Sequence, residues 1–81
     1  MKLLTVLGRR TGPKREKILA SVSYGKDSDP GRVRKGDVID DGKDRDISLG
    51  SGLPEFAARL FLEHLTARFE AKQWRFWTIP A

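Results

Sequence analysis

The 81-residue sequence contains no cysteine and a single histidine. Without cysteine the chain has no disulfide, no thiolate nucleophile and none of the usual cysteine-based zinc sites, and this composition fits a reducing compartment. His64 has no carboxylate three or four residues away that would orient it for proton transfer, so we expect it to be structural. These absences argue against an enzyme.

Long apolar runs are also absent. No stretch approaches the roughly 20 apolar residues that a membrane-spanning helix needs. Residues 1–7 begin like an export signal, with one lysine and a short apolar run, but Gly8, Arg9 and Arg10 end that run too early. We therefore expect a cytoplasmic protein without a membrane partner.

The familiar catalytic and phosphate-binding motifs are incomplete. Ser51 has a glycine on each side, whereas a nucleophile elbow requires glycines two residues away. Gly25 and Lys26 are followed by Asp27 rather than by Ser or Thr, which excludes a phosphate-binding loop of the Walker type. We expect no catalytic residue and no bound cofactor.

An acidic cluster occupies the middle of the chain, and it comprises Asp37, Asp40, Asp41, Asp44 and Asp46. In a calcium-loop frame with Gly42 at the sixth position, Ile39 and Ser48 stand where oxygen ligands are required. The cluster therefore indicates a solvent-exposed hairpin whose aspartates pair with Lys43 and Arg45. We expect no metal site.

The segment Gly50-Ser51-Gly52 precedes a predicted helix and is interpreted as a loop. Two roles remain open for it. Its backbone N–H groups are placed to bind an anion at the helix N-terminus. Alternatively, it is an ordinary flexible connection with Ser51 near the helix cap.

Hydrophobic periodicity predicts a single domain over residues 1–81. The expected strands cover residues 3–7, 17–24, 33–39, 47–49 and 74–79, and the expected helix covers residues 54–72. We expect the first two strands to form an antiparallel hairpin with a wide basic tip around Gly12-Pro13. The order predicts an α+β fold, in which a small antiparallel sheet (β-β-β-β-α-β) carries one long helix on one face.

The predicted helix has an unusually broad apolar surface. Its main stripe comprises Ala58, Phe61, Leu62, Leu65 and Phe69, and a weaker shoulder comprises Phe56, Leu60, Ala67 and Ala71. This arc exceeds the roughly 100° that a helix needs to cover one sheet. The excess is either additional core or a contact surface, and we expect Phe56 and Leu60 at a partner interface or at a homodimer contact.

Positive charge is concentrated at the start of the chain. Residues 1–35 carry ten Lys and Arg against three Asp and Glu, whereas residues 36–81 carry six against eight. We expect one polyanion-binding patch on the hairpin tip and the third strand, formed by Arg9, Arg10, Lys14, Arg15, Lys17, Arg32, Arg34 and Lys35. The competing interpretation is a solvated charged surface that only aids solubility.

Trp77 alternates out of phase with Trp74 and Phe76. If the latter two belong to the core, Trp77 points away from it and is placed to stack on an unpaired base. The sequence therefore supports a small non-enzymatic module that contacts DNA or RNA. The alternative is a phage- or plasmid-type effector that binds a larger host protein complex through its helix or a strand edge.

Overall fold

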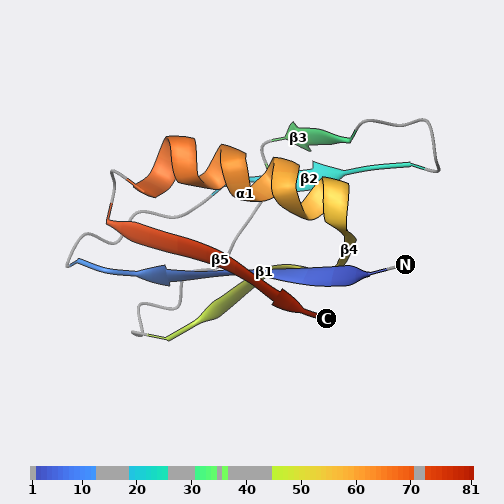
Figure 1. Ribbon diagram of the computed structural model, residues 1–81. Coiled ribbons are helices and arrows are strands. Elements are labelled where there is room, and N and C mark those ends of the chain that lie inside the picture. The colour runs from blue at the N-terminus through green and yellow to red at the C-terminus, as the bar shows by residue number, and fades with distance from the viewer. Residues whose placement is uncertain (1, 13–18, 26–30, 35, 37–44, 71–72) are drawn as a thin grey trace.

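The computed structural model describes residues 2–12, 19–25, 31–34, 36, 45–70 and 73–81. Its elements follow the chain in the order β1 (Leu3–Arg10), β2 (Ser21–Ser23), β3 (Arg32–Arg34), β4 (Ile47–Pro54), α1 (Glu55–Phe69) and β5 (Trp74–Pro80). The strands form a main sheet of three strands and a small sheet of two (Figure 1). The helix packs on one face of the main sheet, so the predicted α+β fold is confirmed.

The main sheet has β1 at its centre, between β4 and β5, and both pairings are antiparallel. Along β1 and β5 the register is regular, from Leu4 opposite Pro80 to Arg10 opposite Trp74. The nearly continuous apolar sequence of β1 suits this central position, because a central strand is shielded on both edges by its neighbours.

The predicted hairpin between the first two strands is wrong. The backbone groups of β1 pair with β4 and β5, which leaves no free edge for β2. Instead, β2 pairs with β3, with Val22 opposite Val33, and this small sheet contacts the helix. Arg9 and Arg10, which were expected near the hairpin tip, lie in β1, and residues 13–18 of that tip lie outside the described residues.

The predicted loop at residues 50–52 is also wrong, because these residues belong to β4. The pairing of β4 with β1 shifts register twice, between Leu4 and Val6 and between Val6 and Leu7. Gly52 has a φ of +66°, a conformation that glycine adopts without steric cost and that β-bulges use. Since this segment is an extended strand, the helix begins directly after Pro54 without a glycine-rich cradle.

The helix begins and ends near the predicted positions. Glu55 lies in its first turn and Arg68 in its last, where each charge opposes the helix dipole favourably. The α-helix ends at Phe69, earlier than predicted, and the N–H of the capping residue Glu70 still donates to the Thr66 carbonyl. Gln73 adopts a φ of +68° as the chain turns into β5. The backbone N–H of Thr11 donates to the Gln73 carbonyl at 2.7 Å, which ties this turn to the end of β1.

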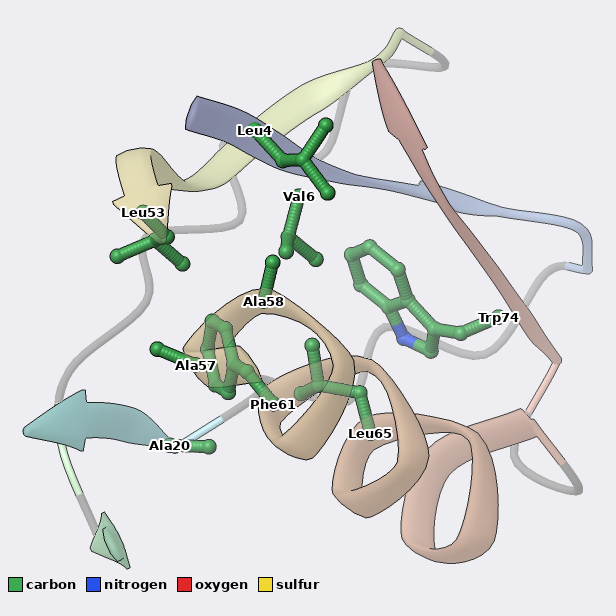
Figure 2. Close-up of a cluster of buried hydrophobic side chains, with 9 residues drawn as sticks. All are labelled: Leu4, Val6, Ala20, Leu53, Ala57, Ala58, Phe61, Leu65 and Trp74. Carbon is green, nitrogen blue, oxygen red and sulfur yellow. The ribbon is translucent and has the colours of Figure 1, made fainter. Parts of the chain in front are cut away.

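The hydrophobic core lies between the helix and the main sheet (Figure 2). The buried side chains are Leu4, Val6, Ala20, Leu53, Ala57, Ala58, Phe61, Leu65 and Trp74. Phe76 packs against this cluster, and its ring stacks on that of Trp74 with the ring centres 6.1 Å apart. Two aromatic residues of β5 are thereby committed to the core, as their alternation predicted.

The helix contacts both sheets, and this explains its broad apolar arc. Gly31, beside β3, lies so close to the shoulder that a Cβ there would sit 3.3 Å from Leu60 Cδ2 and 3.6 Å from Phe56 Cε2. The ring of Phe56 also makes an edge-on contact with Tyr24, with the ring centres 6.1 Å apart. Part of the excess apolar surface is therefore internal packing under the small sheet.

Within the described part of the chain, no helix is long and apolar enough to span a bilayer.

Candidate functional site

The two faces of the main sheet differ in what packs on them. Leu4 and Val6 of β1 point toward the helix together with Trp74 (Figure 2). Because successive side chains of a strand point to opposite faces, their neighbours along β1 and β5 project from the other side. We call this other side the outer face, and on β1 and β5 it comprises Leu3, Thr5, Leu7, Arg9, Arg75, Trp77 and Ile79. The helix packs on the inner face of the main sheet and not on the outer face.

Two arginines stand directly opposite each other on the outer face. Arg9 of β1 is the cross-strand partner of Arg75 of β5, and both residues are exposed. Like charges in this arrangement repel each other, and side chains in such positions have Cβ atoms only about 5 Å apart. An anion placed between the two guanidinium groups would relieve that repulsion.

Asp46 already supplies one negative charge to this pair. Its Oδ1 accepts a hydrogen bond from Arg9 Nη1 at 3.4 Å, and both side chains are about half exposed (49% and 51%). An ion pair this exposed stabilises a protein by only about 0–1 kcal/mol. Arg9 is therefore held weakly and remains accessible to a competing anion. Of the acidic segment, Asp46 thus pairs with Arg9, and residues 37–44 with Lys43 lie outside the described residues.

Trp77 lies next to the arginine pair on the same face. It is opposite Leu7 in the register and is partly exposed, whereas Trp74 is buried on the inner face. Trp77 therefore lies on the side away from the core, as predicted from its phase. Arg75 lies two residues before Trp77 on the same strand face. The sequence interpretation missed Arg75, although the same alternation that set Trp77 apart also places Arg75 beside it.

Arg10 does not contribute to this surface. It faces inward, opposite Trp74, and only 7% of it is exposed. The sequence pair Arg9-Arg10 is therefore divided between the two faces of β1, because adjacent residues on a strand point in opposite directions.

Arg32 and Arg34 belong to a second, separate surface. Both are exposed on β3 on either side of Val33, which packs against the core cluster. Strands β1 and β3 make no contact with each other, and Figure 1 shows the helix between them. The described basic residues are thus divided between two surfaces, and they do not form the single patch expected from the sequence. Lys14, Arg15, Lys17 and Lys35 lie outside the described residues.

The proposed partner-contact residues Phe56 and Leu60 lie at the side of the helix. Phe56 is 45% exposed, the most of the described large apolar side chains, and Leu60 is partly covered. Together with Glu55, Arg59 and Glu63 they line a shallow surface hollow. Arg59 is held there by an ion pair with Glu55 at 2.6 Å. The hollow thus has a small apolar floor and a charged rim.

Other features of the site concern metals and polar contacts. In the part of the chain that the structure describes, no three acidic or histidine side chains come together as metal ligands. Ser51, which was considered near a helix cap, lies on β4, and its Oγ is 3.2 Å from Thr5 Oγ1. Its hydroxyl is thus used in a cross-strand contact within the sheet.

Comparisons with known proteins add no assignment. No protein-family model, no curated protein and no solved structure matches this chain. The function must therefore be argued from the geometry of these surfaces.

Proposed function

We propose that this chain is a small, non-enzymatic binding module that contacts nucleic acid through the outer face of its main sheet. The observation that carries the proposal is the cross-strand pair Arg9 and Arg75, exposed beside Trp77. Guanidinium groups form strong, charge-assisted hydrogen bonds with phosphate oxygens. Two adjacent guanidinium groups can therefore bind one phosphate between them. We place this activity in the cytoplasm.

The charge of the whole chain supports the same partner. A net charge of +5 at neutral pH attracts polyanions at long range, and this attraction speeds encounter with nucleic acid. The revised site differs from the sequence interpretation in its members. It keeps Arg9 and Trp77, adds Arg75, and excludes the buried Arg10.

The decisive experiment compares two double variants with the same change of charge. Arg9→Gln with Arg75→Gln removes both cations of the outer face, and Arg32→Gln with Arg34→Gln removes two exposed cations of β3. Binding to a labelled oligonucleotide is measured by fluorescence anisotropy at about 50 mM salt, where phosphate contacts are strong. We expect the first variant to weaken binding at least about 30-fold, because it loses two charge-assisted hydrogen bonds that each contribute more than about 1 kcal/mol. The second should change binding less than about threefold, in line with screened long-range attraction alone.

The outcomes separate a specific surface from a general charge effect. Equal losses in the two variants would mean that net charge alone drives binding, and the outer face would lose its role. Absence of binding by the wild-type chain at low salt would reject the function.

The exposed Phe56 favours a second candidate function, a protein-binding effector that docks through the side of the helix. Apolar contacts resist salt, whereas phosphate contacts weaken steeply with it. A defined protein partner that binds at high salt, tolerates Arg9→Gln with Arg75→Gln and is lost on Phe56→Ser would establish this alternative.

A further inference from the structure

The outer face has two chemically different ends. Leu3 and Ile79 are exposed at one end, at 42% and 41%, and Arg9 with Arg75 occupies the other end. Trp77 and Leu7 lie between them as a cross-strand pair. The face therefore passes from an apolar surface, through an aromatic ring, to a cationic surface.

A nucleic-acid double helix makes poor use of such a surface. A duplex presents its phosphates outward and buries the flat faces of its bases, so an aromatic side chain on a sheet has no base face to contact. Reading a groove requires an inserted helix or ribbon. Here the apolar side of the helix is occupied by the core, and its exposed surface mixes Arg59 and Arg68 with acidic residues, so it offers no cationic face to a groove.

A single strand matches all three parts of the face. Its bases expose both π-faces, and stacking on an aromatic side chain is available to every base. In an extended strand, residues two apart are about 7 Å from each other, so Arg75 lies close enough to Trp77 to reach the phosphate of a stacked nucleotide. The remaining apolar side chains offer surface to a neighbouring base.

Other binding partners would match only part of the outer face. A second copy of this chain would bring a face with the same positive charge, and like charges at an interface oppose association. An acidic peptide would neutralise Arg9 and Arg75 but would carry no repeating ring system to cover Trp77. Charge and aromatic chemistry together select a flexible polyanion with exposed rings.

We propose that the outer face binds single-stranded nucleic acid, with an unpaired base on Trp77 and an adjacent phosphate between Arg9 and Arg75. This inference rests on the proposed function and adds the strand type and the role of the tryptophan. The sugar is left to the measurement, because stacking and phosphate contacts are common to DNA and RNA.

The test uses the full chain and three labelled probes. The probes are oligo(dT) and oligo(U) of about 12 nucleotides, within the range that small single-strand-binding sites cover, and a DNA duplex of equal length. Anisotropy titrations compare the wild type with Trp77→Ala and Trp77→Phe. We expect the wild type to bind at least one single-stranded probe about tenfold more tightly than the duplex. Trp77→Ala should weaken that binding by between about 5- and 150-fold, the range found for removing one stacking side chain. Trp77→Phe should retain most of it.

A spectroscopic measurement guards against a variant that merely unfolds. In the Trp74→Phe variant Trp77 is the only tryptophan, and stacking of a base should quench its emission in proportion to the bound fraction. Circular dichroism of each variant reports whether the fold is retained.

The outcomes distinguish this inference from the function on which it rests. If single strands and duplex bind equally and folded Trp77→Ala binds both as the wild type does, stacking is rejected, although the nucleic-acid function stands. If Trp77 emission is unchanged at saturation, the base position is rejected. If no probe binds, both proposals are wrong. Oligo(U) and oligo(dT) differ in the 2′-hydroxyl and in the base methyl group, so a difference between them is assigned to the sugar when oligo(dU) binds as oligo(dT) does.

Discussion

At the scale of single residues, position on a strand decides what a charge does. Arg9 and Arg10 are neighbours in sequence, yet one is exposed on the outer face and the other is buried opposite Trp74. Arg75 comes from the other end of the chain and is the true spatial partner of Arg9. Consecutive basic residues in a strand therefore do not predict a single cationic surface.

Asp46 provides a prediction at this scale. Its carboxylate occupies Arg9 in the free protein, at 3.4 Å, and must be displaced before Arg9 can bind a phosphate. Because exposed ion pairs are worth about 0.2–1 kcal/mol, Asp46→Asn should raise affinity for a nucleic-acid probe by up to about fivefold. The change is measured by the same anisotropy titration.

A matched control separates local competition from overall charge. Glu63→Gln on the helix makes the same change in net charge away from the outer face, and we expect it to alter affinity less than Asp46→Asn does. Equal gains in both variants would show that Asp46 has no special relation to Arg9. A loss of affinity on Asp46→Asn would indicate that Asp46 orients Arg9 for binding.

At the scale of the secondary-structure elements, the helix shows how far periodicity reaches. Ala58, Phe61 and Leu65 of the predicted main stripe are fully buried, whereas in the shoulder Phe56 is exposed and Leu60 is partly buried. Ala57 is also fully buried, although it belonged to neither stripe. The helix contacts the small sheet as well as the main sheet, and no local sequence pattern predicts that second contact.

Two of the three phenylalanines of the helix, Phe56 and Phe61, give a stability prediction. Removal of a buried aromatic side chain costs about 3–5 kcal/mol, and an 81-residue domain has only about 4–12 kcal/mol of stability in all. We expect Phe61→Ala to unfold much of the population or to lower the midpoint of urea denaturation sharply. Phe56→Ala loses an exposed ring contact with Tyr24 and should cost less than about 1.5 kcal/mol.

The comparison is made by urea denaturation followed by circular dichroism. If Phe61→Ala yields no folded baseline, Phe61→Leu should still fold and show a smaller loss than the alanine variant. A greater loss at Phe56 than at Phe61 would contradict the position of the core between the helix and the main sheet.

At the scale of the whole molecule, the fold separates charges that the sequence groups together. The first 35 residues carry most of the positive charge, but the described part of that segment contributes β1 to one sheet and β2 with β3 to the other. The result is two cationic surfaces on separate sheets. On the outer face Trp77 lies beside Arg9 and Arg75, whereas the ring of Tyr24, next to β3, packs edge-on against Phe56.

Salt dependence offers the corresponding prediction. The logarithm of the binding constant falls linearly with the logarithm of salt concentration, with a slope of about −0.7 for each phosphate neutralised on a single strand. Because Arg9 and Arg75 are proposed to share one phosphate, Arg9→Gln with Arg75→Gln should make the slope shallower by about 0.7. Arg32→Gln with Arg34→Gln should leave it nearly unchanged. Anisotropy titrations at four salt concentrations measure both slopes, and a change confined to the β3 variant would move the site to the small sheet.

The sequence by itself determined the features that depend on neighbours along the chain. The strand and helix periods, the inward position of Trp74 and Phe76, the outward phase of Trp77 and the α+β class all follow from which side of a local element each side chain occupies. Only the tertiary structure decided which strands pair, that residues 50–52 continue a strand, and that Arg75 meets Arg9. Pairing depends on which edges stay free once the whole chain has collapsed. Because β4 and β5 occupy both edges of β1, the second strand pairs with β3 instead.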